Sequence, residues 1–162
     1  MKKLLKPIAL VFAVTSLLIG CVNDHLVPQF EQENAAYTGQ FNFKTKSQQF
    51  GVNSEGKNII KVVIEGTGQF SFAGNVSFVD EFDFLLATGA AAHKVTYTTA
   101  NGDKIYATMA TQVGPGSITG TTTLTGGTGR FAKITGSSTN VGPPVSATGE
   151  GSWKEEGGKV TF

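Results

Sequence analysis

Cysteine and histidine are nearly absent from this sequence. Its 162 residues include one cysteine, Cys21, and two histidines, His25 and His93. A soft metal site needs several such ligands and a disulfide needs two cysteines, so neither is predicted. The formal net charge is only +1, which gives no support for nucleic-acid binding. We therefore expect no metal, no cofactor and no nucleic-acid partner.

Long apolar runs are also scarce, and the clearest one lies near the start of the sequence. Residues 8–19 are apolar except for Thr15 and Ser16, and three lysines precede them. The run is too short to span a bilayer comfortably, so it favours a signal peptide over a transmembrane helix.

The run ends in Leu-Ile-Gly-Cys at residues 18–21, which resembles a bacterial lipoprotein signal. The resemblance implies cleavage before Cys21 and acyl chains on that residue, with the membrane as partner. Several acyl chains exceed what stable anchoring needs. The alternative is an ordinary thiol after an ordinary signal peptide, but no A-x-A-like site precedes Cys21. Val22 at the next position favours the outer membrane under the enterobacterial sorting rule.

Three segments are therefore predicted: a signal peptide over residues 1–20, a lipidated tether over 21–36, and one domain over 37–162. Without the three leader lysines the formal charge becomes −2. From Tyr37 onward apolar residues alternate with polar ones, and no stretch has the period of an amphipathic helix. About eight short strands result, the late ones running through Val145 and Trp153 and through Val160. We predict an all-β, eight-stranded antiparallel barrel, whose closure removes exposed sheet edges.

Glycines mark the predicted bends. Gly66-Thr67-Gly68 inside a strand pattern predicts a bend or bulge. Asn101-Gly102 between two alternating segments predicts a hairpin with a type I′ turn. The stretch LTGGTGRFAKITG, residues 124–136, contains a G-x-G-x-x-A spacing, but no helix pattern follows it, which excludes a dinucleotide site. We interpret it as a barrel corner closed by Phe131.

Two segments, TANGDKIYA at residues 99–107 and LTGGTGRFA at residues 124–132, resemble the bacterial branch of the allene oxide cyclase barrel proteins. The resemblance implies an eight-stranded antiparallel barrel with an apolar cavity, related in shape to dirigent proteins. The plant cyclases guide a reactive fatty-acid epoxide inside that cavity. Their polar positions have no match here, so no catalytic residue is carried over.

The inward positions of the predicted strands are rich in large apolar side chains. They either fill the core or line a ligand cavity, because glycines such as Gly66, Gly68 and Gly151 share their parity. The candidate ligand-binding residues are Phe41, Phe70, Phe72, Phe78, Phe82, Phe84, Tyr97 and Met109.

Catalytic candidates are few. Serines lack a nucleophile motif, which leaves Asp80 as a weak candidate acid or base. Asp80 shares the parity of Phe78 and Phe82, but the interpretation we favour is that a bulge or turn exposes it. Glu81 and Asp83 belong to the opposite, solvated face.

The leading functional hypothesis is a lipid-anchored envelope protein whose barrel, without enzymatic activity, binds a small apolar ligand or serves as an interaction module. One alternative is an isomerase or cyclase that acts by confining its substrate. The other is a structural protein with a filled core.

Overall fold

The computed structural model describes residues 33–162, which form a closed barrel of eight antiparallel strands. The predicted signal peptide, Cys21 and most of the tether lie outside the described residues. The predicted all-β barrel is confirmed. Its strands are β1 (Ala35–Val52), β2 (Asn58–Phe70), β3 (Gly74–Leu85), β4 (Ala90–Thr99), β5 (Lys104–Gly114), β6 (Ser117–Gly127), β7 (Thr135–Gly142) and β8 (Glu150–Thr161).

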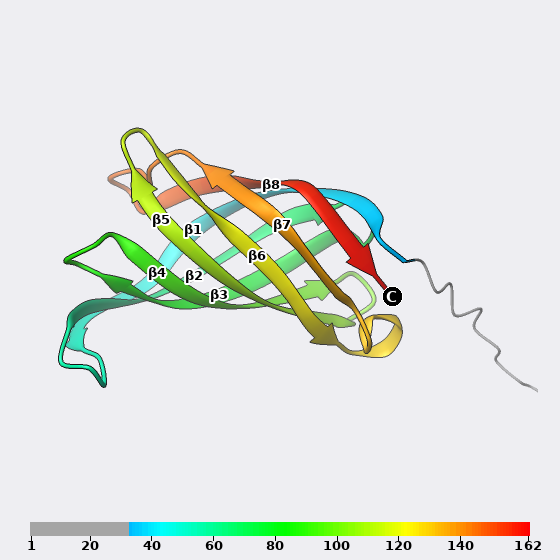
Figure 1. Ribbon diagram of the computed structural model, residues 1–162, viewed down its shortest axis with the longest axis horizontal. Helices are drawn as coiled ribbons and strands as arrows, with labels where there is room; N and C mark the ends of the chain where they lie inside the picture. The colour runs from blue at the N-terminus through cyan, green and yellow to red at the C-terminus, as the bar shows by residue number, and fades with distance from the viewer. Residues whose placement is uncertain (1–32) are drawn as a thin grey trace, which may run out of the picture.

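Each strand pairs with the next, and β8 closes the barrel against β1. The start of β1 and the end of β8 lie at one end of the barrel (Figure 1), where Ala35 pairs with Val160. The hairpins that join β1 to β2, β3 to β4 and β5 to β6 lie at the other end, with the β7–β8 loop. We call the first the closed end and the second the mouth end.

Aromatic side chains fill the closed half of the barrel. The rings of Phe41 and Phe70 meet edge to face with centroids 4.9 Å apart, and Tyr97 lies 4.9 Å from Phe70. Phe41 also stacks on Trp153 at 4.8 Å. Such contacts each add about 0.5–1.5 kcal/mol to the energy of apolar burial. This half is a packed core.

The glycines of β2 make room for these rings. A Cβ on Gly68 would lie 2.2 Å from Cδ1 of Phe41, and one on Gly66 would lie 2.8 Å from Cζ of Phe78. The predicted bulge at this point is wrong, because the register with both neighbouring strands is continuous there. The register shift of β1 against β2 lies between Thr45 and Ser47 instead.

Two other local predictions need correction. The hairpin at Asn101-Gly102 is present, but only Gly102 has a positive φ, of 90°, and its N–H donates to the carbonyl of Thr99. The loop therefore has three residues, with a left-handed glycine after the turn, rather than type I′ geometry. The late strand begins at Glu150, so Val145 lies in the β7–β8 loop. Pro143 and Pro144 directly precede Val145. Because proline has no backbone N–H group, neither can donate the hydrogen bonds that pair one strand with the next.

The corner between β6 and β7 has the predicted role. Residues Gly129–Phe131 form a short 3-10 helix, and Phe131 is 0% exposed at the closed end. The guanidinium carbon of Arg130 lies 4.6 Å from the centre of the Phe131 ring. Phe131 thus closes the barrel from inside while Arg130 covers it from outside.

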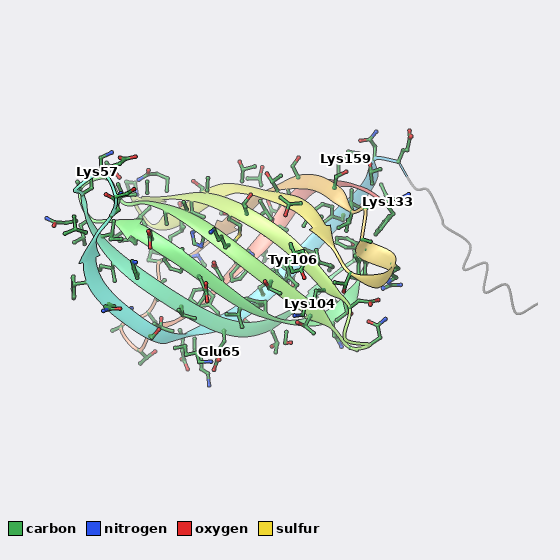
Figure 2. The ribbon with its side chains drawn as sticks, turned by 90° about the horizontal axis from the view of Figure 1, so that it is seen from below. Lys57, Glu65, Lys104, Tyr106, Lys133 and Lys159 are labelled. Carbon is green, nitrogen blue, oxygen red and sulfur yellow. The ribbon has the colours of Figure 1, made fainter. Side chains whose placement is uncertain are left out.

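The outer wall carries the charged side chains. Figure 2 shows Lys57 at the mouth end, Lys133 and Lys159 at the closed end, and Glu65 between them. Glu65 forms an ion pair of 3.0 Å with Lys46 on the outside. Within residues 33–162 there is no helix long and apolar enough to cross a membrane.

Candidate functional site: an apolar cavity at the mouth end

The mouth half of the barrel contains a cavity of about 320 Å³. All eight strands contribute to its wall, with Ile60, Val62 and Ile64 of β2 along one side and Ile118 from β6. Exposed residues of the mouth, among them Val113, Pro143 and Val145, also line it, so the cavity opens there. Its volume is at the small end of the range for small-molecule sites.

Apolar side chains surround the opening. Five large apolar residues are exposed on the segments that end at the mouth: Phe50, Val52, Leu86, Val113 and Val145. Two of them, Val113 and Val145, also line the cavity. The path from solvent into the cavity is therefore apolar along much of its edge.

The structure divides the predicted ligand-binding residues into two groups. Phe82, Phe84 and Met109 line the cavity, as do Phe43 and Trp153. The others belong to the filled half: Phe41, Phe70, Phe78 and Tyr97 are buried in the core, and Phe72 packs at the closed end. The inward side chains therefore fill one half of the barrel and leave a cavity in the other.

Asp80 is buried, with 0% exposure, and the interpretation that a bulge or turn exposes it is wrong. It pairs without interruption with Ile64 on β2 and Val95 on β4, so its side chain keeps the inward parity of Phe78. Glu81 is exposed and Asp83 is partly exposed, as the strand period predicts.

His93 of β4 joins Asp80 to Thr111 of β5. Its Nδ1 lies 2.8 Å from Oδ2 of Asp80, and its Nε2 lies 2.8 Å from Oγ1 of Thr111. His93 directly faces Phe82 on β3 and Met109 on β5. Asp80 and Thr111 lie two residues along those strands from Phe82 and Met109, so they are diagonal neighbours of His93. The Phe82 ring lies 4.2 Å from the imidazole. All five side chains line the cavity, so this chain of polar groups stands in an otherwise apolar wall.

The Asp80 carboxyl group is only half satisfied by this arrangement, since Oδ1 is buried without a partner. Burial raises the pKa of Asp80 above its ordinary value of 3.8, against the opposing effect of the hydrogen bond with His93. Asp80 has no exposed surface and is bonded to the imidazole, while Thr111 is partly exposed. A ligand in the cavity would meet Thr111 and His93 before Asp80.

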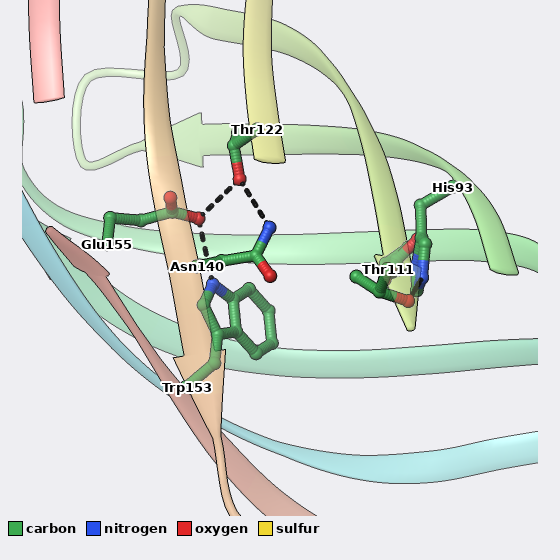
Figure 3. A network of polar contacts seen from close by, with 7 residues as sticks. His93, Thr111, Thr122, Asn140, Trp153 and Glu155 are labelled. Carbon is green, nitrogen blue, oxygen red and sulfur yellow. Dashed lines mark hydrogen bonds and ion pairs between the residues drawn. The ribbon is translucent and has the colours of Figure 1, made fainter. Parts of the chain in front are cut away.

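A second polar network centres on Glu155 of β8. Its carboxyl group accepts hydrogen bonds from Thr122 at 2.8 Å and from Nε1 of Trp153 at 3.0 Å (Figure 3). It also accepts one from Ser138. Ser138 in turn accepts a bond of 2.8 Å from the hydroxyl of Tyr37. Burial raises the pKa of Glu155 above 4.5, and its three hydrogen bonds oppose that shift.

The same network orients Asn140 at the cavity wall. Thr122 donates its hydroxyl proton to Glu155 and therefore accepts from Nδ2 of Asn140, at 3.0 Å. This fixes the amide group, since its carbonyl oxygen must then face away from Thr122. In Figure 3 that oxygen lies on the side of the amide group away from Thr122. Asn140 lines the cavity, so its oxygen is an available acceptor there.

Burial also raises the pKa of the two interior tyrosines. The pKa of Tyr37 rises to about 12, mainly through burial, despite its bond to Ser138. The pKa of Tyr97 rises well above 10, and its hydroxyl is buried without a partner. Both phenols therefore stay neutral at physiological pH.

Sequence reasoning missed Glu155, Thr111 and Asn140. The signal for Glu155 was available, because it shares the parity of Trp153 on one strand. The alternation is interrupted directly after Glu155, however, because the register of β8 against β1 shifts near Gly157, which has a φ of 62°. The sequence pattern alone therefore did not single out Glu155 as buried. Thr111 and Asn140 were indistinguishable from the many other polar strand residues.

Among residues 33–162, no three His, Cys, Asp or Glu side chains are grouped so that they could hold a metal ion. The arrangement can instead accept an apolar molecule and offer it a few hydrogen-bonding groups. Asp80 and His93 also form a hydrogen-bonded pair of a carboxyl group and an imidazole, the side-chain types that most often serve in general acid–base catalysis.

Comparison with known proteins adds little to this description. The sequence matches no protein-family model and no curated protein. One solved structure, described as pyocyanin demethylase, is similar at 14% identity over 74% of this chain and 98% of that chain, with a TM-score of 0.44. Similarity of this strength says nothing about what the cavity binds.

Proposed function

We propose that this protein binds a small apolar molecule in the cavity at the mouth end of its barrel. The observation that carries the proposal is the contrast between the two halves. The closed half is packed with aromatic rings, while the mouth half keeps about 320 Å³ of space bounded by phenylalanine, isoleucine and valine side chains. Burial of apolar ligand surface would supply about 25 cal/mol per Å² before the costs of association.

The position of Trp153 provides the test. It is the sole tryptophan of the chain and it lines the cavity. Its fluorescence should therefore change when an apolar probe such as indane enters. The full chain, purified without detergent, should also carry an apolar adduct in a native mass spectrum. If indane leaves the fluorescence unchanged and no adduct is found, the proposal fails.

We also propose that the chain is anchored to the bacterial envelope through acyl chains on Cys21, with the outer membrane as its location. The support is the Leu-Ile-Gly-Cys pattern after a basic and apolar leader. Anchoring is tested by replacing Cys21 with serine. The variant should leave the membrane fraction, and a mature variant that stays there would contradict this part of the proposal.

An isomerase or cyclase acting by confinement is a second candidate, favoured by the burial of Asp80 beside His93 in the cavity wall. A buried carboxyl group with a raised pKa, such as that of Asp80, is frequent at catalytic sites. If the candidate is right, Asp80→Asn lowers the turnover of an epoxide or polyene substrate. Equal turnover by both proteins would exclude Asp80 from the chemistry.

A further inference from the structure

The polar groups of the cavity restrict the chemistry of its ligand. Among the residues of the described range 33–162 that line it there is no lysine and no arginine. An anionic ligand would lose its hydration without gaining a fixed positive charge, and an unpaired buried charge is very costly. The single acidic residue of the wall, Asp80, is covered, so it offers a ligand cation no direct partner. A charged head group inside the cavity is therefore disfavoured for either sign.

Thr111 can act either as a donor or as an acceptor toward a ligand. If the imidazole proton lies on Nδ1 toward Asp80, then Nε2 accepts from Thr111, whose oxygen lone pairs are left for a ligand donor. If the proton lies on Nε2, His93 donates to Thr111, whose own proton is free for a ligand acceptor. A hydroxyl group on the ligand satisfies both arrangements, because it both donates and accepts.

Asn140 adds an acceptor on another part of the wall. Its amide nitrogen is engaged by Thr122, and its carbonyl oxygen faces away from that bond. A ligand with an acceptor alone, such as a ketone, could use Thr111 but not this oxygen. A ligand hydroxyl can donate to one of the two residues.

We propose that the ligand is a small neutral alcohol or phenol whose hydroxyl group bonds to Thr111 and whose apolar body packs against Phe82, Phe84 and Trp153. The inference rests on the proposed binding function and adds the class of ligand to it. The Asp80–His93 pair acts as a positioning couple that holds Thr111 ready for the hydroxyl group.

A matched set of probes tests this inference. Indane, 2-indanol, 2-aminoindane and indane-2-carboxylate share one body and differ in a single group. Their affinities for the full chain are measured by the fluorescence of Trp153, excited where indane does not absorb. We expect 2-indanol to bind at least tenfold more tightly than the carboxylate and the ammonium form of the amine.

The contribution of Thr111 is isolated by comparing, between variants, the ratio of the affinities for 2-indanol and for indane. In Thr111→Val, which keeps the side-chain shape, the preference for 2-indanol over indane should fall by about fivefold, which is the usual value of one net hydrogen bond. In Thr111→Ser, which keeps the hydroxyl, the preference should persist. Circular dichroism checks that both variants fold, and Thr111→Ala replaces the valine variant if that one does not.

The outcomes separate the two proposals. If indane binds but the preference for 2-indanol is the same in Thr111→Val and in the parent, the ligand class is wrong and the binding function stands. The ligand class is also wrong if the carboxylate or the amine binds as tightly as the alcohol. If neither indane nor 2-indanol binds, both proposals are overturned.

Discussion

Ala91 and Ala107 offer a direct comparison between the hollow and the filled half of the barrel. Both are buried alanines on adjacent strands, β4 and β5. Ala91 lines the cavity, whereas Ala107 belongs to the packed core beside Val95 and Leu124. The same substitution, alanine to leucine, should therefore have opposite effects at the two positions.

The magnitudes follow from packing. Leucine adds three carbons, each worth about 0.8 kcal/mol when buried, and loses roughly 0.5–1 kcal/mol of side-chain entropy. In the cavity, Ala91→Leu should therefore raise the free energy of unfolding by about 1.5 kcal/mol. In the filled half the extra atoms displace packed neighbours, and Ala107→Leu should lower it by about 1–3 kcal/mol.

Urea denaturation measures both effects, as shifts of the midpoint at constant slope. Ala91→Leu should also weaken indane binding, because its side chain occupies the ligand's space. The reasoning is refuted if Ala91→Leu destabilises the protein as much as Ala107→Leu does, since the mouth half would then be as tightly packed as the closed half.

Three further predictions test the rest of the structure. Because folding raises the pKa of Glu155, this residue contributes its full stabilisation below about pH 4.5, and the contribution is lost as the pH rises through the folded-state pKa. The urea midpoint should therefore decline over this pH range, and Glu155→Gln should flatten the decline. Gly68→Ala should lower the free energy of unfolding by about 1–3 kcal/mol, because the added methyl group clashes with Phe41. Gly51→Ala is the control and should lower it far less, since no atom lies within 4 Å of the added group. Equal melting temperatures of the two variants would contradict this prediction. Phe131→Ala should lower the free energy of unfolding, measured by urea denaturation, by about 3–5 kcal/mol, because it removes a fully buried ring. An unchanged urea midpoint would show that the corner does not close the barrel.

The strand pattern was sufficient to predict the barrel, because alternation with a period of two persists through most strands. The buried state of Phe131 was also predictable, since glycines on both sides allow a tight corner around one large residue. The geometry of individual turns was harder to predict from the sequence. At Asn101-Gly102, pairing across β4 and β5 selects a three-residue loop over the two-residue turn that the dipeptide favours in isolation.

The site could not be predicted in the same way, because parity tells which side chains point inward but not how far along the barrel they lie. Phe78 and Phe82 share one strand face, yet the first packs against Tyr97 in the filled half and the second lines the cavity. The contact of Asp80 with His93 depends on the register of β3 against β4, which fixes their diagonal placement. Glycines also proved ambiguous, because Gly66 and Gly68 admit rings instead of leaving space.

The central claim is that an apolar molecule enters the mouth half of the barrel and no other part of the interior. The most direct measurement is a nuclear magnetic resonance titration of the full chain with indane. It should follow the indole N–H of Trp153, the methyl group of Met109 and the methyl groups of Ile134, which is buried near the closed end. The account predicts saturable shifts at Trp153 and Met109 with Ile134 unchanged. Shifts confined to Ile134, or none at any of the three, would contradict it.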